Sequence, residues 1–498
     1  MPLRIDSKLA PRHLVPAIER LFELSAAKIR AIEKAWRPED GTPVFTVGGR
    51  YTTRGWTEWT QGFQFGSALL QFDATGDIDF LEIGRRGTVE RMASHVSHTG
   101  VHDHGFNNVS TYGNLLRLDR EGRLDANPRE REFHELALKI SGAVQAARWT
   151  RLADGTGFIH SFNGPHSLFV DTVRSLRVLA VAHRLGHVLM GEQDARISLL
   201  RRLVEHGANT ARYSVYYGEG RDAYDVWGRT AHEAVFNTAS GVFRCPNSQQ
   251  GYSPFSTWTR GLAWALCGFA EQLEFLETVA GPELDEAGAG LPWDRLAPGG
   301  LARDASGTMA VCGLFLRAAV ATAEFYLAHC CADGVPLWDT GAPNAHRLGN
   351  YLAKPSDPFN PWEPVDSSAA AIAAQGFFRL GRYLAAGARR PTSGRLSAAA
   401  ESARRDLAGQ SARYTQAGLT IARTLLQEPY LSTRRNHQGL LLHSVYHRPN
   451  GWDAIPRGQK VPNGESSMWG DYHLRELALL LLREAREKPY LTFFGGCP

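Results

Sequence analysis

Long apolar runs are lacking in this chain of 498 residues. A membrane-spanning helix needs about 20 consecutive apolar residues, and no window of the sequence reaches that length by inspection. The N-terminal segment, residues 1–21, is interrupted by charges and prolines, so it lacks the apolar core of a secretory signal peptide. Contact with a membrane is therefore not expected, and we predict a cytoplasmic protein.

Cysteine is scarce, and an excess of one charge is absent. The six cysteines, at positions 245, 267, 312, 330, 331 and 497, show neither C-x-x-C spacing nor histidines at the intervals of zinc ligands. We therefore expect free thiols in a reducing compartment, no metal and no cofactor. The 55 basic and 51 acidic residues are interspersed and give a net charge of +4. This balance argues against nucleic acid as a partner.

The main regularity of the sequence is helical periodicity. Apolar residues recur at helical spacing in many separate segments, such as Leu314, Ala318, Ala321 and Phe325, whereas the alternation typical of strands is scarce. We predict an all-α protein that forms one continuous domain over residues 1–498. Two stretches rich in Gly, Ala and Pro, at 278–308 and 385–395, are interpreted as surface insertions rather than linkers.

Loops rich in Gly, Asp, Ser and Trp repeatedly precede the predicted helices. Several place Asp, Ser or Thr at the N-cap position of the following helix. Equivalent loops ahead of successive helices would gather at one end of a closed helical ring. That arrangement predicts an (α/α)6 barrel, in which residues far apart in sequence build one pocket. The loops are WTEWTQGF (56–63), HDHGF (102–106), SLFVDT (167–172), QGYSPFSTWTRGLAW (250–264), PVDSSAAAIAA (364–374) and GESSMWGDYH (464–473).

Tryptophans concentrate in or beside loops of this kind. A flat aromatic ring offers apolar area to the C–H face of a sugar, so the concentration favours a saccharide pocket. A single tryptophan is more often part of the core, so only the concentration of several tryptophans in these loops favours a saccharide pocket. Its members are at positions 56, 59, 258, 264, 338, 362, 452 and 469.

Two aspartates in these loops are candidates for acid–base chemistry: Asp103 in VHDHGF and Asp171 in LFVDTV. Two carboxylates can divide the acid and base roles when their surroundings move their pKa values apart, and apolar surroundings hold one protonated. Asp171 has apolar neighbours on both sides and is the predicted acid. A helix cap is the commoner role for a single Asp, and only the pair within the whole pattern favours catalysis.

Other polar residues in the pattern are candidates for binding. His232, Gln250, Trp258 and Arg260 could orient the hydroxyls and a carboxylate of a substrate. Arginine suits a carboxylate because its planar fork donates two parallel hydrogen bonds.

Taken in order from about residue 56 to 473, the motifs WTQGF, HDHGF, VDT, QGYSPFSTWTRGLAW, DSSAAAIAA and WGDY resemble the unsaturated glucuronyl hydrolases, glycoside hydrolase family 88. The resemblance implies an (α/α)6 barrel with Asp103 and Asp171 as the two catalytic carboxylates, of which Asp171 is the general acid/base. It also implies a set of pocket residues, namely Trp59, His232, Gln250, Trp258, Arg260 and Trp264.

The implied substrate is an oligosaccharide released by a polysaccharide lyase, with a C4=C5 double bond in its terminal uronic acid. The enzyme's acid protonates C4, water adds at C5, and the resulting hemiketal opens and expels the remaining saccharide. An unsaturated rhamnogalacturonyl hydrolase and a conventional glucuronidase on the same barrel stay open as alternatives. A non-catalytic saccharide-binding protein is less favoured, because binding alone does not require a buried acid. The leaving sugar, the linkage and the oligomeric state stay open.

The chain departs from the family pattern in three places. These are an added segment at 212–231, the stretch 278–308, and GFQFGSALLQF (62–72), where the family more often carries a tryptophan. We expect all three to lie near the rim of the pocket, where they would alter the leaving sugar rather than the reaction.

Overall fold

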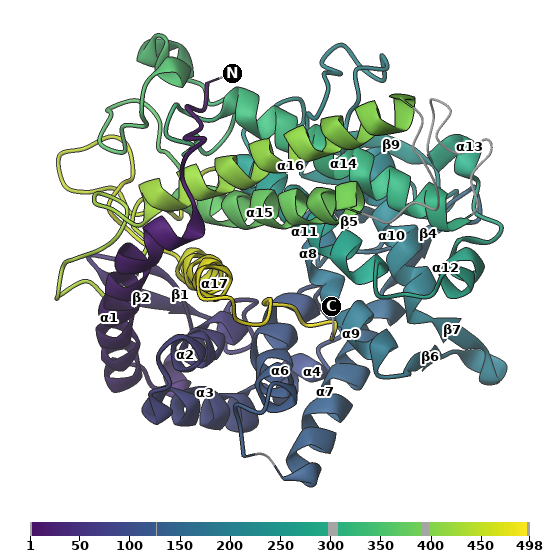
Figure 1. Ribbon diagram of the computed structural model, residues 1–498, viewed down its shortest axis with the longest axis horizontal. Helices are drawn as coiled ribbons and strands as arrows, with labels where there is room; N and C mark the ends of the chain where they lie inside the picture. Colours follow the sequence, from purple (N-terminus) through teal and green to yellow (C-terminus); the bar gives the residue numbers. More distant parts are fainter. Residues whose placement is uncertain (1, 126, 297–306, 390–397, 496–498) are drawn as a thin grey trace.

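A computed structural model describes residues 2–125, 127–296, 307–389 and 398–495 of the chain. Parts of the two predicted insertions, 297–306 and 390–395, therefore lie outside the described residues. The chain runs once around the molecule, from α1 and α3 through α7 and α10 to α14 and α16 (Figure 1). The last helix, α17, closes the circuit by packing against both α1 and α2.

Six buried helical segments form the inner ring, and each contacts the next until α17 returns to α2. Every residue of α11 is buried, as expected of a helix that is surrounded by other helices on all sides. The inner segments are α2 (Gln61–Thr75), α5 (His104–Asn108) with η2 (Val109–Gly113) and α6 (Asn114–Arg120), α8 (Thr172–Ser175) with α9 (Arg177–Arg184), α11 (Thr259–Leu276), α15 (Ser367–Arg389) and α17 (Met468–Ala485).

Six further helices cover the inner ring from outside. In α1 the buried residues include Leu14, Ile18 and Leu21, whose spacing of three and four places them on one face. The two rings confirm the predicted all-α class and (α/α)6 barrel. The outer helices are α1 (Pro11–Ala35), α3 (Ile78–Arg91), α7 (Pro128–Ala147), α10 (Leu199–Tyr213), α14 (Gly307–His329) and α16 (Ala398–Leu425).

One outer helix contradicts an expectation from the sequence. Residues Thr308–His329 of α14 are long and apolar enough to cross a membrane by length and composition. Most of the apolar window, 67%, is buried inside the protein, where α14 packs against α10, α11 and α12. The apolar run is therefore explained by packing between other helices.

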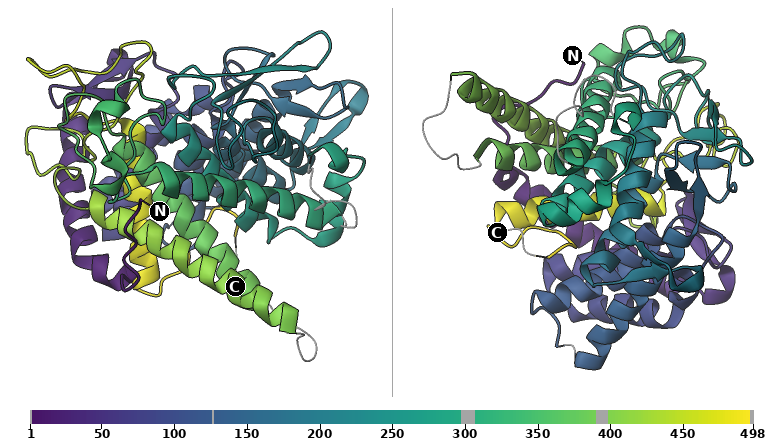
Figure 2. Two further views of the ribbon diagram at one scale, coloured as in Figure 1. Left: turned by 90° about the horizontal axis from the view of Figure 1, so that it is seen from above. Right: turned by 90° about the vertical axis from the view of Figure 1, so that its right-hand side faces the viewer.

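The strands are short and lie in four small antiparallel sheets of the described chain. They gather with the long loops along one side of the helical ring, whereas the α15–α16 hairpin extends from the other (Figure 2, left). The pairs are β1 (Thr42–Val47) with β2 (Arg50–Arg54), β3 (Trp149–Arg151) with β4 (Gly157–Ile159), β5 (Ser167–Phe169) with β8 (Glu233–Phe236) and β9 (Phe243–Asn247), and β6 (Val188–Met190) with β7 (Arg196–Ser198).

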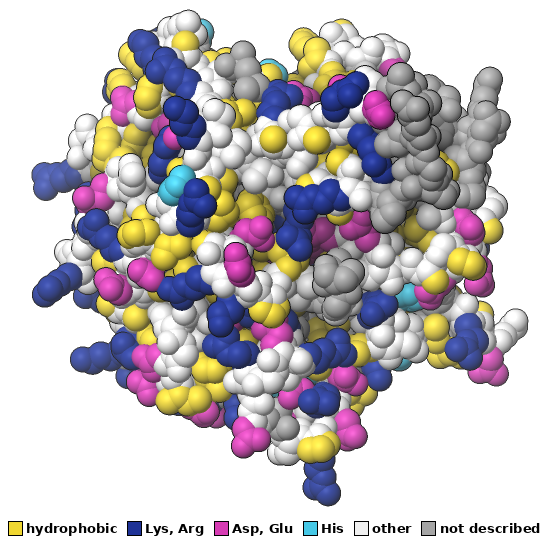
Figure 3. Space-filling view, viewed as in Figure 1, with side chains coloured by type: hydrophobic (Ala, Val, Ile, Leu, Met, Phe, Trp, Pro, Cys, Tyr) yellow, Lys and Arg dark blue, Asp and Glu magenta, His cyan; other side chains and the backbone are white. Residues whose placement is uncertain are grey.

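Short helices complete the described structure, and charged side chains of both signs are interspersed over the face shown in Figure 3. The mixture of positive and negative side chains on this face agrees with the interspersed charges of the sequence. The short helices are η1 (Pro38–Asp40), α4 (Ala93–Val96), η3 (Glu192–Asp194), α12 (Gly281–Gly288), α13 (Trp293–Leu296), η4 (Ala345–Leu348) and η5 (Tyr351–Ala353).

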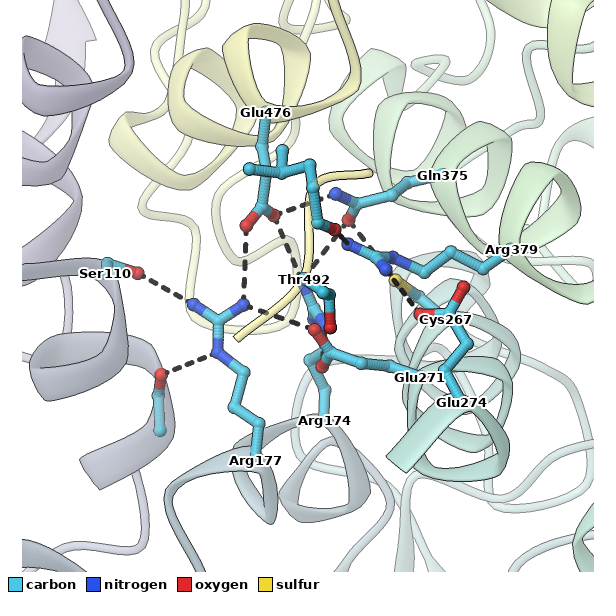
Figure 4. Close-up of polar contacts among 12 residues, drawn as sticks. Ser110, Arg174, Arg177, Cys267, Glu271, Glu274, Gln375, Arg379, Glu476 and Thr492 are labelled. Atoms are coloured by element: carbon cyan, nitrogen blue, oxygen red, sulfur yellow. Dashed lines mark hydrogen bonds and ion pairs between the residues drawn. The ribbon is translucent and has the colours of Figure 1, made fainter. Parts of the chain in front are cut away.

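A cluster of ion pairs is buried where the inner helices meet (Figure 4). Glu476 of α17 lies 3.0 Å from Arg174 of α8 and 3.5 Å from Arg177 of α9. Glu271 of α11 pairs with both arginines, and Gln375 of α15 donates to Glu476 at 2.9 Å. Because these side chains are almost wholly inaccessible to water, the cluster ties four inner helical segments together through charges that must all be compensated.

Candidate active site

The six loops singled out in the sequence each lead into an inner helix. They precede α2, α5, α8, α11, α15 and α17, respectively. Residues from five of these loops line one cavity of about 510 Å³, and the sixth, 364–374, supports it from behind through Asp366. The prediction that the loops gather at one end of the ring and build a common pocket is confirmed.

Aromatic rings form much of the cavity wall. Five of the eight predicted tryptophans line it: Trp59, Trp258, Trp264, Trp452 and Trp469. Trp59 stacks on Trp469 with ring centroids 5.1 Å apart. The other three lie elsewhere: Trp56 is 65% exposed, the Trp338 ring donates to Glu363, and Trp362 contacts Arg347.

Both predicted catalytic aspartates line the cavity. Asp103 stands directly before α5 and Asp171 directly before α8, yet neither side chain caps its helix by a hydrogen bond. Their exposed fractions are only 7% and 8%. The helix-cap explanation, which the sequence favours for a single Asp, therefore does not account for either side chain.

A histidine that the sequence interpretation left without a role lies between the two carboxylates. The Nε2 atom of His102 is 3.4 Å from Asp171 Oδ1 and 3.7 Å from Asp103 Oδ1. Its place next to Asp103 in VHDHGF was visible in the sequence, but its closeness to Asp171 depends on how α5 and α8 pack.

The pKa values of the two aspartates diverge in the direction opposite to that predicted. Burial, together with the charge of Asp171, raises the pKa of Asp103. Burial also acts to raise the pKa of Asp171, but its interaction with His102 outweighs burial and holds that pKa below the ordinary value. The raised pKa expected from the apolar flanks of Asp171 is therefore wrong, because His102 lies 3.4 Å from this carboxylate. The assignment of Asp171 as the acid stays a prediction.

His232 lies behind the cavity wall and does not line the cavity. Its ring packs against Phe169 and Trp258, with centroids 4.4 and 4.6 Å apart. Its Nδ1 accepts hydrogen bonds from the backbone N–H groups of Gln249, at 3.0 Å, and Gln250, at 3.3 Å. Burial lowers the pKa of His232 to about 4, so the neutral ring supports the loop that carries Gln250.

Arg260 lines the cavity, but its fork is already engaged. One terminal nitrogen donates to Asp366, at 3.0 Å, and to the Val445 carbonyl; the other donates to Gln250 Oε1, at 2.7 Å, and to the Tyr446 carbonyl. The guanidinium lies between the Trp258 and Trp469 rings, 4.7 and 4.8 Å from their centroids. The sequence interpretation assumed that the Arg260 guanidinium is free to bind a substrate carboxylate with two hydrogen bonds. In the structure, the guanidinium instead joins three loops and presents its charge to the cavity.

Buried aspartates hold the other pocket loops by accepting backbone N–H groups. Asp453 accepts from Tyr446 and His447, and Asp471 accepts from Leu440 and Leu441. Hydrogen bonds of this kind fix loops that would otherwise move. In the described parts of the chain, no group of three or more His, Cys, Asp or Glu side chains is placed to hold a metal ion.

None of the three departures from the family pattern lines the cavity in its described part. Residues 278–296 follow the C-terminal end of α11, opposite to the end at which Trp258 and Arg260 stand. The segment 212–231 packs on α14, where Gly228 closely approaches the backbone of Ala321. Residues 62–72 belong to the buried helix α2. The expectation that all three lie near the rim is therefore wrong for 278–296. The other two ranges contact pocket loops: Phe63 packs on Trp59, and the Thr230 N–H donates to Thr257 Oγ1.

Close packing between α5 and α8 sets the distance between the aspartates, and Gly105 allows it. The Gly105 N–H donates to Ser175 Oγ at 2.9 Å, and a Cβ at position 105 would overlap the Ser175 carbonyl. We expect Gly105→Ala to reduce the free energy of unfolding by roughly 2 kcal/mol and to impair the site, because the helices must separate.

Chemical denaturation measures this effect, with Gly409→Ala as the matched control. Gly409 lies on the exposed face of α16 with open space around it, so its replacement should stabilise the helix slightly. Equal stability of the Gly105→Ala variant and the wild type would contradict the packing account.

No protein-family model matches the chain, but individual proteins do. An unsaturated glucuronyl hydrolase of Formosa agariphila is 24% identical over 329 residues, which are 66% of this chain and 64% of that protein. The chain therefore spans just under two thirds of this relative's length. An unsaturated glucuronyl hydrolase of Bacillus sp. (strain GL1) is 24% identical over 448 residues, 87% of this chain and 89% of the relative.

Solved structures are similar over almost the whole chain. An unsaturated glucuronyl hydrolase specific for heparin superposes with a TM-score of 0.65 at 18% identity, covering 95% of this chain and 98% of that one. The Bacillus sp. GL1 structure gives 0.63 at 21% identity, covering 94% and 97%. A Streptococcus agalactiae variant complexed with dGlcA-GalNAc6S gives 0.58 at 17% identity, covering 99% of each chain.

These structures show that the chain has the (α/α)6-barrel fold. With the sequence matches added, the chain is similar to unsaturated glucuronyl hydrolases over most of its length.

Proposed function

We propose that this protein removes the terminal 4,5-unsaturated uronic acid from oligosaccharides produced by polysaccharide lyases. The observation that carries the proposal is the placement of Asp103 and Asp171 around His102 in a cavity lined by aromatic rings. The names of the relatives, and the unsaturated saccharides in two of the solved complexes, support the same substrate class.

The proposed reaction adds water across the C4=C5 double bond. The Asp171 carboxyl gives its proton to C4, and the positive charge that develops at C5 is shared with the ring oxygen. The Asp171 carboxylate then takes a proton from water as the water oxygen bonds to C5. The C5 hemiketal opens by breaking its bond to the ring oxygen, and the C1 hemiacetal that results expels the leaving sugar.

The other cavity residues serve this reaction without exchanging protons with the substrate. Asp103 lies near the same Nε2 atom of His102 as Asp171 and offers negative charge to the cation that develops on the sugar ring. The stacked rings of Trp59 and Trp469 offer a flat apolar face to the sugar. Arg260 adds a fixed positive charge that suits the substrate carboxylate.

A panel of lyase products tests the proposed function. The ultraviolet absorbance of the C4=C5 double bond should fall with at least one unsaturated disaccharide from glycosaminoglycan, gellan, ulvan or pectin. Comparing pectin-derived with glycosaminoglycan-derived substrates separates a rhamnogalacturonyl from a glucuronyl preference. No loss of absorbance with any of them would overturn the proposal.

Arg54 at the cavity mouth is expected to attract the anionic substrate. Its guanidinium is exposed at the end of β2 and lies 4.8 Å from the Trp452 ring centroid and 5.6 Å from that of Tyr446. We expect Arg54→Ala to raise KM about 3- to 10-fold with little change in kcat, because a rim charge contributes to encounter and ground-state binding.

The KM effect should shrink at high salt, because salt screens exposed charges. Arg50→Ala is the matched control, since Arg50 is exposed on the same strand but does not line the cavity. Steady-state kinetics at two salt concentrations measure both variants. Equal KM values for the Arg54→Ala and Arg50→Ala proteins would contradict a role for Arg54 in substrate capture.

A further inference from the structure

His102 is enclosed in a way that an ordinary core histidine is not. Only 2% of the residue is exposed, and neither ring nitrogen has a hydrogen-bond partner among the described residues. Its Nε2 nevertheless lies within 4 Å of one oxygen of each catalytic carboxylate. The Phe162 ring stacks on one side, with centroids 6.1 Å apart, and the Phe169 ring meets it edge-on at 5.5 Å. The ring is therefore held in place by packing, and its Nε2 atom approaches the two carboxylates.

The charged groups around His102 favour its protonated form. Burial acts to lower the pKa of His102, but Asp103 and Asp171 outweigh burial and the opposing charge of Arg148, so the pKa is raised. The nearby histidines on other elements differ. Burial lowers the pKa of His104 and of His160 to about 4, that of His206 to about 3, and that of His232 to about 4. Of these neighbouring histidines, His102 is the one whose pKa is raised.

This arrangement resolves a conflict in the proposed reaction. Asp171 must carry a proton when the substrate is bound, yet its interaction with His102 favours its ionised form. A single proton held between Nε2 of His102 and Oδ1 of Asp171, which lie 3.4 Å apart, serves both needs, since it can move onto the carboxylate and from there to C4.

We propose that His102 is a positioning residue that stores the proton which Asp171 delivers to C4. The inference rests on the proposed function. The proton on Nε2 of His102 passes to the ionised Asp171 carboxylate, which delivers it to C4, so that neither group then holds a proton. When the Asp171 carboxylate takes a proton from the attacking water, that proton returns to Nε2 of His102. One proton goes to C4 and one comes from water, so the cycle balances.

The pH dependence of kcat tests the inference with His102→Gln, which keeps a polar nitrogen in place but cannot hold the extra proton. We expect kcat to fall about 10²-fold while KM changes less than about 3-fold. The alkaline limb of the kcat profile should move to lower pH, because Asp171 alone loses its proton sooner than the pair does.

His206→Gln is the matched control. His206 is also buried, and its Nδ1 accepts from the Ile159 N–H at 3.0 Å, but it does not line the cavity. This variant should lose stability without moving the alkaline limb. An active wild type whose profile keeps the same limb after His102→Gln would overturn the inference alone. A wild type without turnover on any unsaturated saccharide would instead overturn the proposed function.

A second measurement does not depend on activity or on folding of the His102 variant. NMR titration of the wild type should give His102 a pKa above its ordinary value of 6.5. In the Asp171→Asn protein this pKa should fall, because one neighbouring negative charge is gone. A wild-type His102 that titrates below 6.5 would overturn the inference even in an active enzyme.

Discussion

Turnover of an unsaturated disaccharide is expected to fall by about 10³-fold or more when Asp171 is replaced by Asn. The amide can neither give a proton to C4 nor take one from water. The fold should tolerate the change, because the side chain does not cap α8 and asparagine has the same size and shape. Loss of absorbance at the double bond measures the rate, and circular dichroism confirms the fold.

Two further variants sharpen this result. Asp103→Asn should reduce kcat by about 10²-fold, because it removes electrostatic stabilisation and leaves the proton donor intact. Asp406→Asn, on the exposed face of α16, should have no effect. If the Asp171→Asn enzyme kept a tenth of the wild-type rate, Asp171 could not be the acid.

Breaking the buried ion cluster should give the largest loss of stability. Glu476→Gln keeps the shape of the side chain but leaves Arg174 and Arg177 without one of their carboxylates (Figure 4). Removing one partner of a buried ion pair costs about 3–5 kcal/mol, because the remaining charge stays buried. We expect a reduction of this size in the free energy of unfolding at pH 7.

The stability that Glu476 contributes should depend on pH. Burial acts to raise the pKa of Glu476, but Arg174 and Arg177 outweigh burial and lower it strongly from 4.5. A lowered carboxyl pKa stabilises the fold above the unfolded-state pKa, and this contribution is lost as the pH falls. The stability difference between the wild type and Glu476→Gln should therefore be full at neutral pH and begin to shrink below about pH 4.5.

An exposed ion pair provides the control for the cluster. Arg382 and Glu484 lie 3.5 Å apart with about 40% of each side chain exposed. Glu484→Gln should change the free energy of unfolding by less than about 1 kcal/mol, because water screens the pair. Similar losses from Glu484→Gln and Glu476→Gln would contradict the importance assigned to burial.

The ring and its pocket could be predicted because their signals are local and repeated. Loops with turn residues, aspartates and tryptophans precede six inner helices, and each loop shows its character within a few residues of sequence. Asp103 and Asp171 were found for the same reason, and the structure brings both to one cavity.

What could not be predicted depends on contacts between distant segments. Arg260 pairs with Asp366, which lies 106 residues away along the chain, so no local signal indicates that its guanidinium is already hydrogen-bonded. The pKa of Asp171 depends on His102, which stands before a different helix. The segments 212–231 and 278–296 follow the C-terminal ends of α10 and α11. Their positions relative to the cavity therefore depend on how these helices are oriented in the barrel.

The most direct test of the account compares two disaccharides that differ only in the C4=C5 double bond. With the unsaturated disaccharide, we predict that the absorbance of the double bond disappears and that the leaving sugar appears in equal amount. With the saturated counterpart, we predict no release of the leaving sugar, because C4 cannot be protonated. Release from the saturated disaccharide at a comparable rate would show conventional glycoside hydrolysis and contradict the central claim.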